Sequence, residues 1–417
     1  MRLLKLTRTV ENKILAARRT GDAGAMRAAA RIVADVRRGG DAAVLSWSNR
    51  FDSTELRAPN LWVSTKEMRN ARSEVTPAFR AAIEAAARNI RRVAERQKPK
   101  EWTFEVEAGV RISQIVRPIE SIACYAPGGR FSLVSTLLMT VIPAQVAGVP
   151  EIIVASPRPG AAFLAAAEML GVRRVLRVGG TQAIAALAYG TRMIPRVDKI
   201  FGPGNRYVTA AKQLISADCA IDMLAGPTEA LFLASRGNPR FIAADLLAQA
   251  EHDPEAISML VTTSARFATA VAQEIAAQLN RLPADSAAHR SIRKNGAILV
   301  APGLAEAIDF VNRFAPEHLT VEAGGAEMLR RIHAAGSIFL GDWSAQAFGD
   351  YASGTNHVLP TRGLARARGG LSVADFVKCI TVQEVTRVAA RRLVPVAEKF
   401  AAAEGLVAHG RSVEVRR

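Results

Sequence analysis

Cysteine is scarce in this sequence, and its spacing excludes two kinds of protein. The 417 residues contain three cysteines (Cys124, Cys219 and Cys379), which lie far apart and show no CxxC spacing. This pattern excludes a disulfide framework and a thiolate zinc site, and it favours a reducing compartment. The sequence also lacks an apolar stretch long enough to span a bilayer, and its first residues lack the apolar core and cleavage site of a signal peptide. We therefore expect a cytoplasmic protein that does not enter a membrane.

Aromatic residues are also few, at 6%, whereas 49% of the residues are hydrophobic and 22% are charged. These proportions are typical of globular proteins. Abundant Ala, Val, Leu and Arg with few aromatics suit alternating helices and parallel strands better than a β-sandwich. A chain of this length is expected to form two or three domains.

Acidic residues are outnumbered, since 38 Asp and Glu stand against 55 Lys and Arg, for a formal net charge of +17. A basic protein can attract nucleic acid, an anionic surface or an anionic substrate. The arginines, however, are spread along the whole chain in short pairs, such as residues 91–92 and 391–392. No basic run is interleaved with aromatic residues, as a nucleic-acid groove would prefer. We therefore expect no nucleic-acid partner.

From residue 120 onward, short β-rich runs alternate with helical segments, which is the signature of βαβ units and parallel sheets. A first series of such units ends at "KIFGPG", and a second begins with "ALFLAS" (230–235) and ends with "GSIFLGD" (336–342). The first hundred residues and the tail (384–417) have helical periodicity, and residues 110–119 alternate as a strand should. We predict two doubly wound, incomplete Rossmann-like α/β/α domains with small N- and C-terminal helical extensions.

Histidine is rare, with six in the chain, and the stretch "LLAQAEHDPEA" (246–256) contains one of them. On a helix, Gln249 and His252 are three residues apart, so both project from one face near its end. An amide oxygen and an imidazole nitrogen at this spacing could bind one cation, and zinc would need at least two more ligands. Taken alone, however, the stretch is better interpreted as a solvated helix terminus or a cap.

Two further polar segments could carry chemistry. In "RFAPEHLTV", Glu317 and His318 follow Pro316 in the loop before a strand, where a carboxylate and an imidazole could act as general acid–base partners or form an exposed loop pair. In "FGDYASGTNHVLP", Asp350 and His357 lie in a polar loop after a buried strand, a position typical of ligand sites at the carboxyl edge of α/β sheets.

The tail segment "AAEGLVAHG" brings Glu404 and His409 within five residues of each other, a weak signal on its own.

The GxGxxG fingerprint of dinucleotide-binding proteins is absent. Three other glycine-rich exits from strands occur instead: "CYAPGGR" (124–130), "VGGTQA" (178–183) and "FGPGN" (201–205). Each could lay backbone amides against phosphates, or form an ordinary tight turn. A dinucleotide is therefore permitted by these segments but not required.

Together these segments resemble the histidinol dehydrogenase family. The resemblance runs from about residue 30 to the C-terminus, in the order and approximate spacing of the family. Its motifs are "GGDAAVLSWSNRFD", "CYAPGGR", "STLLMTVIPAQVAGVPEI", "GGTQAIAALAYGT", "VDKIFGPGNRYVTAAK", "AGPTEALFLAS", "DLLAQAEHDP", "RFAPEHL", "GDYASGTNHVLPT", "GLSVADFVK" and "AEGLVAH". The combination is specific, although no single motif is decisive.

The resemblance implies a role for each candidate residue. It implies one Zn²⁺ per subunit and NAD as cofactors, with Glu317 and His318 as the catalytic pair. The implied zinc ligands are Gln249, His252, Asp350 and His409. The implied substrate-binding residues are Thr228, Gln249, His252, His318, Asp350, His357, Glu404 and His409, and the implied NAD-binding residues are Tyr125, Gln182 and Asn205. Thr228 departs from the family pattern, because the family usually has Ser at this position. Threonine keeps the hydroxyl of serine.

The family further implies a homodimer whose tail completes the partner's active site. We accordingly expect an N-terminal extension (1–23) and a first α/β domain with the metal and catalytic loops (24–118 plus 236–370). We expect a second α/β domain on the NAD side (119–235) and a helical tail that reaches the partner subunit (371–417).

The reaction implied by the resemblance is the oxidation of L-histidinol to L-histidine through the aldehyde, using two NAD. The alternative is a relative on the same scaffold that oxidises another small alcohol, such as a sulfonated diol, whose negative charge would suit the basic chain. His357 and Glu404 argue against it, because the histidinol interpretation uses them to hold an imidazole and an ammonium.

Overall fold

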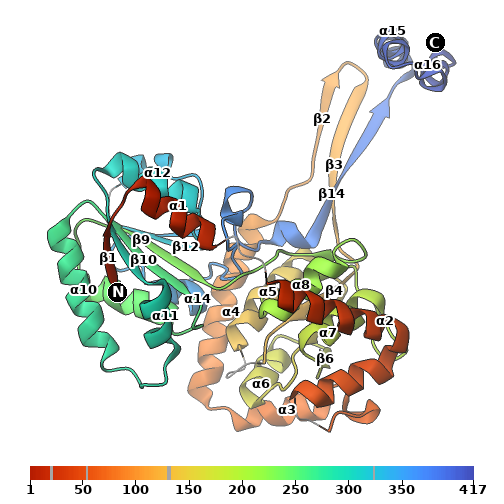
Figure 1. Cartoon of the computed structure of the whole chain (residues 1–417). Helices are drawn as coiled ribbons and strands as arrows, with labels where there is room; N and C mark the ends of the chain where they lie inside the picture. Colours follow the sequence, from red (N-terminus) through yellow and green to blue (C-terminus); the bar gives the residue numbers. More distant parts are fainter. Residues whose placement is uncertain (19–21, 53–54, 129–132, 323–324) are drawn as a thin grey trace.

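Two parallel β-sheets and a projecting arm make up the computed structural model of this chain (Figure 1). The structure describes residues 1–18, 22–52, 55–128, 133–322 and 325–417. None of the helices in these ranges is long and apolar enough to cross a membrane. The prediction of an α/β fold is confirmed.

The six-stranded sheet has the order β1-β11-β10-β9-β12-β13, and all its neighbouring strands are parallel. Its central strand β9 is buried along its whole length, as expected when helices cover both faces of a parallel sheet. The strands are β1 (Arg2–Lys5), β9 (Glu229–Leu233), β10 (Ile257–Thr262), β11 (Ala297–Val300), β12 (His318–Val321) and β13 (Ser337–Leu340). The helices in this half are α1 (Arg8–Ala17), α9 (Pro239–Ala250), α10 (Ala265–Leu279), α11 (Ala287–Asn295), α12 (Leu304–Phe314), α13 (Gly325–Arg331) and α14 (Gln346–Tyr351).

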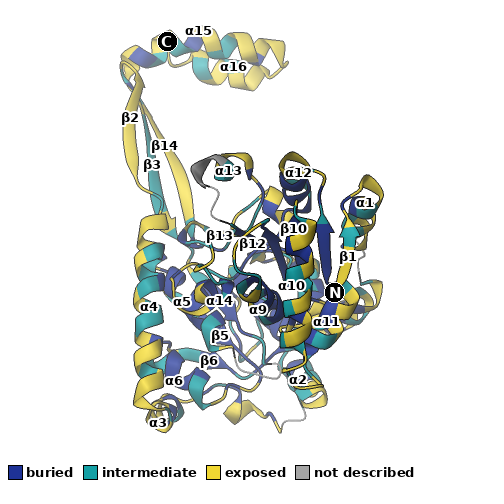
Figure 2. Ribbon diagram, turned by 90° about the vertical axis from the view of Figure 1, so that its left-hand side faces the viewer, coloured by how far each residue is buried: buried dark blue, intermediate teal, exposed yellow. Residues whose placement is uncertain are grey.

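The five-stranded sheet has the order β6-β5-β4-β7-β8 and is also parallel throughout. Its strands are β4 (Ser121–Tyr125), β5 (Glu151–Ala155), β6 (Arg174–Leu176), β7 (Lys199–Phe201) and β8 (Ala220–Ile221). Its helices are α5 (Val134–Ala147), α6 (Ala161–Met169), α7 (Gly180–Tyr189) and α8 (Arg206–Ile215). Figure 2 shows the buried residues concentrated in the two sheets and the helix faces against them.

Both sheets repeat one topology. If β9 and β4 are each counted as strand 1, the strands of both sheets have the order 3-2-1-4-5. This is the strand order of the dinucleotide-binding fold without its sixth strand. The six-stranded sheet gains its extra strand from β1 at the N-terminus, which pairs with β11. The strand order reverses between β9 and β12 in one sheet and between β4 and β7 in the other. The predicted pair of incomplete Rossmann-like units therefore matches the sheet topology.

Apart from α1, the helices of the N-terminal hundred residues pack on the five-stranded half. α2 (Ala23–Asp52) contacts α7 and α8, α3 (Thr65–Glu74) contacts α6, and α4 (Pro77–Gln97) contacts α5. The predicted grouping of residues 24–118 with 236–370 differs from these contacts, because periodicity shows that a helix is amphipathic but not which sheet it covers. β9 also lies in the six-stranded sheet, although it falls inside the predicted range 119–235. We propose that the division between the halves follows the sheets.

The arm is built from an antiparallel sheet in the order β14-β3-β2 and two terminal helices. Its elements are β2 (Trp102–Glu107), β3 (Val110–Pro118), β14 (Val377–Val385), α15 (Arg387–Ala403) and α16 (Val407–Glu414). The tail predicted as helical over 371–417 thus contains a nine-residue strand, whose pairing partner β3 lies more than 250 residues earlier in the chain. Figures 1 and 2 show the arm extending away from the two sheets.

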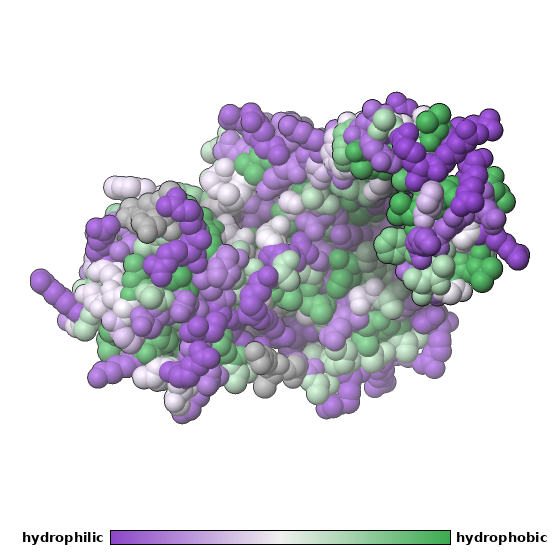
Figure 3. Space-filling view, turned by 90° about the horizontal axis from the view of Figure 1, so that it is seen from above, coloured by the Kyte–Doolittle hydropathy of each residue, from purple (hydrophilic) through white to green (hydrophobic). Residues whose placement is uncertain are grey.

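The arm exposes much of its apolar surface. Every residue of β2 is exposed, and all of β14 except its two ends is exposed. In the view from above, apolar side chains are interspersed with hydrophilic ones over its helical end (Figure 3). The large apolar side chains exposed on the arm are Trp102, Phe104, Val106, Ile380, Val382, Val388, Val396, Phe400, Leu406, Val407 and Val415. A small sheet that buries neither face is marginally stable by itself.

Candidate active site

The predicted catalytic residues meet at the amino ends of two central strands. His318 is the first residue of β12 and pairs with Ala230 of β9, and Thr228 directly precedes β9. α9 runs back from β9, so its C-terminal end, with Gln249, reaches the same edge. The sequence analysis expected the loop with Asp350 at the carboxyl edge of the sheet. That expectation was wrong, because α14 follows β13 and returns Asp350 to the amino edge beside His318.

Glu317 is a buried carboxylate, 7% exposed, that is held by two hydrogen bonds. Its Oε2 accepts from the Thr228 hydroxyl at 2.7 Å and from the Glu229 backbone N–H at 2.8 Å. Burying a carboxylate is costly unless such donors compensate for lost water. The turn before it includes Ala315 in the left-handed region, at φ 50°. Both the turn and the donors fix the position of Glu317.

His318 lies between two carboxylates. Its Nδ1 is 3.7 Å from Glu317 Oε2 and its Nε2 is 3.6 Å from Asp350 Oδ1, while its ring stacks on Phe339. Neither ring nitrogen has a hydrogen-bond partner among the described residues. Burial lowers the pKa of His318, but the negative charges of Glu317 and Asp350 outweigh it and raise the pKa to about 10. The imidazole is therefore oriented by charge and stacking.

Asp350 connects His318 with His357. Its carboxylate is 7% exposed, and its Oδ1 lies 4.0 Å from His357 Nδ1, which contacts the Asp350 carbonyl at 3.1 Å. Burial alone would raise the pKa of Asp350, but His318, His357 and His252 together hold it below its usual value. Burial lowers the pKa of His357, despite the opposing charge of Asp350. The ionised carboxylates of Glu317 and Asp350 thus give the site negative charge.

The loop with His357 joins this cluster to the other half of the protein. His357 Nε2 is 3.3 Å from Thr136 Oγ1 in the first turn of α5, and Asn356 donates to the Met139 carbonyl at 2.7 Å. From α4, Asn89 donates to the Ala352 carbonyl at 2.8 Å. The cluster consequently lies where α5, the helix that follows the first glycine-rich exit, meets the six-stranded half.

Gln249 lies in the last turn of α9, whereas His252 lies two residues beyond Ala250, where this helix ends. Gln249 is buried, and its Oε1 lies 3.3 Å from Thr228 Oγ1, which connects it to Glu317. His252 is exposed, with Nδ1 2.9 Å from the Ala248 carbonyl, so Nε2 is its outward-facing nitrogen. The charge of His252 contributes to the lowered pKa of Asp350, after the larger effects of His318 and His357.

Glu404 and His409 lie apart from the cluster. Both are exposed at the end of the arm, in the segment between α15 and α16 and within α16 (Figure 1). Within one chain, the described residues contain no group of three or more His, Cys, Asp or Glu side chains placed to hold a metal. A four-ligand site that includes His409 would therefore need two chains.

The remaining donors fit a cation of zinc type. Gln249, His252 and Asp350 supply oxygen and nitrogen ligands, which zinc accepts together with one more. The Asp350 carboxylate is buried, yet its nearest imidazole nitrogens are 3.6 and 4.0 Å away, beyond hydrogen-bonding distance. No hydrogen-bond donor of the described residues therefore occupies the Asp350 carboxylate, which leaves its oxygens free to bind a cation.

The described parts of the three glycine-rich exits (124–128, 178–183 and 201–205) meet at the carboxyl edge of the five-stranded sheet, and residues 129–130 of the first lie outside the described residues. The Tyr125 hydroxyl accepts from the Gly180 N–H at 3.1 Å, and burial raises the pKa of Tyr125 to about 12. The Asn205 side chain caps α8 by accepting from the N–H groups of Tyr207 and Val208. Gln182 is buried, and its Oε1 has no partner in the described chain. Tyr125 and Asn205 thus bind protein groups here and brace the loops whose backbone could face a dinucleotide.

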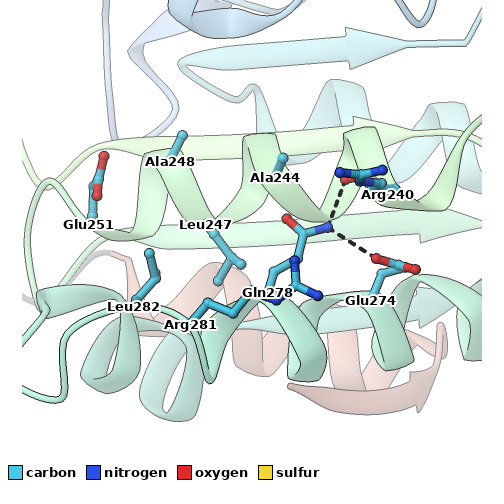
Figure 4. A pocket seen from close by; sticks show the side chains of 9 residues that line it. All are labelled: Arg240, Ala244, Leu247, Ala248, Glu251, Glu274, Gln278, Arg281 and Leu282. Atoms are coloured by element: carbon cyan, nitrogen blue, oxygen red, sulfur yellow. Dashed lines mark hydrogen bonds between the residues drawn. The ribbon is translucent and has the colours of Figure 1, made fainter.

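A separate polar cavity lies between α9 and α10 (Figure 4). Its volume is about 580 Å³. On its wall, Gln278 donates to the Arg240 carbonyl and to Glu274. None of the predicted site residues lines it, since α9 turns a different face toward it. The lining residues are Arg240, Ala244, Leu247, Ala248, Glu251, Glu274, Gln278, Arg281 and Leu282.

Comparison with known proteins identifies the family. Residues 16–417 match the family described as histidinol dehydrogenase. The chain belongs to this family. It is 45% identical over 392 residues to the histidinol dehydrogenase of Methanothermobacter thermautotrophicus, covering 92% of each chain. It is 46% identical over 409 residues to that of Geobacillus kaustophilus, covering 96% of each.

A solved structure gives the same result. The crystal structure of histidinol dehydrogenase from Elizabethkingia anophelis superimposes with a TM-score of 0.94 at 37% identity, covering 100% of this chain and 98% of that one. The family predicted from the sequence is confirmed, and the chain is an NAD-dependent oxidoreductase acting on a CH–OH group. The alternative, a dehydrogenase for a sulfonated diol, is not supported.

Sequence reasoning missed two residues behind the site. Arg18 and Glu229 form an ion pair in which both side chains are almost wholly buried. Glu229 gave a signal that could have found it, because a carboxylate in the otherwise apolar strand "ALFLAS" and its flank requires a buried partner. Arg18 gave no signal, since it lies among exposed arginines of similar appearance in the first twenty residues.

The Thr228 hydroxyl provides the first test. In T228V we expect kcat for NADH formation to fall about ten- to hundredfold, because a hydrogen bond to a charged group contributes about 1.5–3 kcal/mol. T228S, which keeps the hydroxyl, is the matched control and should stay within about twofold of the parent. Equal activity of T228V and T228S would show that the contact with Glu317 has no catalytic role.

Proposed function

We propose that this chain oxidises L-histidinol to L-histidine through L-histidinaldehyde in two successive NAD-dependent steps. The observation that supports this most strongly is the meeting of Glu317 and His318 with Gln249 and Asp350 at one edge of the sheet, in a member of the histidinol dehydrogenase family. One residue pair suited to proton transfer thus lies beside donors suited to a metal.

The proposed metal ligands are Gln249, His252, Asp350 and, from the partner subunit, His409. When bound, zinc would supply a Lewis acid that anchors the imidazole and amine of the substrate. The same ligands, with Thr228, His318, His357 and Glu404, would then surround the substrate. Glu404 adds a negative charge that suits a cationic amino alcohol.

His318 is the proposed base of the alcohol step. Removing a hydride from the carbinol carbon requires that its hydroxyl proton leave as well, and a neutral imidazole can accept it. Despite the opposing effect of burial, the carboxylates of Glu317 and Asp350 raise the pKa of His318 and favour its protonated form, whereas a cation bound beside Asp350 would offset their charge and favour the neutral form. Neither ring nitrogen of His318 has a hydrogen-bond partner among the described residues. Stacking on Phe339 and the flanking carboxylates keep the ring oriented toward the cluster. The ring nitrogen of His318 that accepts the proton is thus held in a fixed position.

Glu317 is the proposed base of the aldehyde step. The aldehyde must gain a water oxygen before a second hydride can leave, and a carboxylate can take the proton from that water. Glu317 Oε2 is engaged by Thr228 and Glu229. Its other oxygen therefore remains to accept from water.

NAD is the proposed hydride acceptor for both oxidations, with Tyr125, Gln182 and Asn205 on its side of the site. Support comes from the reversal of strand order between β4 and β7, since ligands of doubly wound sheets bind outside the carboxyl ends of such strands. The N-termini of α7 and α8 also lie at this edge and favour a diphosphate.

A homodimer is proposed because the chain alone leaves its arm uncovered and the metal site without a fourth ligand. Apolar surface of this extent on a projecting arm is typical of a protein interface. The arm would carry Glu404 and His409 to the partner. A reducing, cytoplasmic location is proposed from the three free cysteines, two of them buried.

The division of labour between the two bases can be tested with H318N. We expect oxidation of L-histidinol to collapse, by about a hundredfold or more, because the alcohol step loses its base. Oxidation of supplied L-histidinaldehyde should fall much less. The measurement is NADH formation from each substrate, with E317Q as the reciprocal variant. If H318N keeps both activities equally, His318 does not have this role.

Sharing of the site between subunits can be tested by mixing two inactive variants. H409A lacks a tail ligand and H318N lacks a body residue, so each homodimer should be inactive. After joint refolding or co-expression, half the dimers are mixed and each has one intact site, so on the order of a quarter of the parent activity should return. Absence of recovery, with mixed dimers verified by two tags, would mean that the tail serves its own subunit.

A further inference from the structure

Arg18, from the N-terminal segment, makes a dense set of buried contacts. Its Nε donates to Glu229 Oε1 at 2.8 Å and its Nη2 to Glu229 Oε2 at 2.5 Å, a two-point ion pair. Its Nη1 donates to the carbonyl of Phe314, and its guanidinium stacks over the Phe314 ring at 3.7 Å. The side chains of Arg18 and Glu229 are only 5% and 1% exposed. All these groups lie inside the protein rather than on its surface.

Glu229 connects this ion pair to Glu317. Its backbone N–H donates to Glu317 Oε2, so the residue paired with Arg18 also holds the catalytic carboxylate. The Glu229 carboxylate additionally accepts from the Arg362 N–H at 3.1 Å. Burial raises the pKa of Glu229, and the negative charge of Glu317 raises it further. The positive charge of Arg18 opposes both effects.

Phe314 provides a second connection. It is the last residue of α12, and the chain then passes through Ala315, in its left-handed conformation, to Pro316, Glu317 and His318. The carbonyl at a helix end lacks a partner within its own helix, and Arg18 supplies one. Arg18 therefore contacts both sides of the position of Glu317: the helix end that leads into the turn, and the strand residue that donates to it.

We propose that Arg18 is a positioning residue for Glu317, acting through its two-point ion pair with Glu229 and its bond to the Phe314 carbonyl. The proposal rests on the proposed role of Glu317 in aldehyde oxidation. A buried ion pair contributes little net stability compared with apolar residues of similar size, yet loss of one partner leaves an uncompensated charge. Here that charge would lie on Glu229, next to the catalytic carboxylate.

The first part of the test measures kinetics. In R18M we expect kcat for oxidation of L-histidinaldehyde to fall at least about tenfold, because a charge-assisted contact is lost beside Glu317. KM should stay within about twofold, since Arg18 touches none of the proposed substrate-binding residues. R18K keeps the charge but not the two-point geometry and should fall between R18M and the parent.

A double-variant cycle separates positioning from general damage. If Arg18 acts through Glu317, then adding R18M to E317Q should change kcat with the aldehyde by less than about twofold. An equal loss in both backgrounds would overturn the proposal, as would a parent-like kcat in R18M. Should R18M fail to fold, R18K and R18K/E317Q form the same cycle and decide in the same way.

Arg313 offers a matched control. It pairs with the buried Glu11 and so also connects α1 with α12, but it forms no hydrogen bond or ion pair with Glu229 or Glu317. R313M should therefore keep kcat for the aldehyde within about twofold of the parent. A loss equal to that of R18M would assign the effect to docking of α1 and would overturn the proposal.

A structural readout keeps the result independent of the proposed function. Crystal structures of the parent and R18K should show Glu317 Oε2 within hydrogen-bond distance of Thr228 and Glu229 in the parent and displaced in the variant. If the parent fails to reduce NAD with either substrate, the proposed function is wrong. The position of Glu317 in the two crystal structures still tests whether Arg18 positions it. An unmoved Glu317 in R18K would overturn the positioning proposal whatever the activities are.

Discussion

Two buried carboxylates on either side of one imidazole are the constraint on which this site depends. Glu317 and Asp350 flank His318, and each is almost wholly removed from water. Glu317 is compensated by a hydroxyl and a backbone N–H, whereas Asp350 has only imidazoles at 3.6 and 4.0 Å. Since a buried charge must be paired to be tolerated, we propose that a bound cation adds to this arrangement.

The fold explains why these side chains meet. Two copies of an incomplete dinucleotide-binding topology stand side by side, and each uses a different edge of its sheet. The catalytic cluster lies at the amino edge of β9 and β12, while the glycine-rich exits lie at the carboxyl edge of the other sheet. The loop with Asn356 and His357 docks on α5 and joins the two. A cofactor on one half can thus face a substrate on the other.

Much of this could be predicted from the sequence, and the failures have physical causes. The βα alternation predicted the parallel sheets because each buried strand is a short apolar run, as in β4 and β9. β14 was missed because its pairing with β3 joins residues far apart in the chain, and no local pattern encodes that register. The packing of α2 to α4 was misassigned because an apolar helix face does not specify its partner sheet.

In the site, too, features set by nearby residues could be predicted, whereas features set by residues far apart in the chain could not. Helical spacing predicted Gln249 and His252 near one helix end, although α9 ends at Ala250 and His252 lies beyond it. Adjacent positions in the sequence predicted the pair Glu317 and His318. The edge at which Asp350 lies could not be predicted, because it depends on the return path of α14. Arg18 could not be predicted either, since its partner Glu229 lies 211 residues away.

We propose that one metal ion binds beside Asp350 and joins two subunits. Anomalous diffraction at the zinc edge, from crystals of the zinc-loaded protein, tests this claim most directly. We expect one zinc per subunit, at about 2.0–2.2 Å from Gln249, His252 and Asp350 and from His409 of the partner subunit. Zinc bound away from Asp350, or ligated by His409 of the same chain, would contradict it.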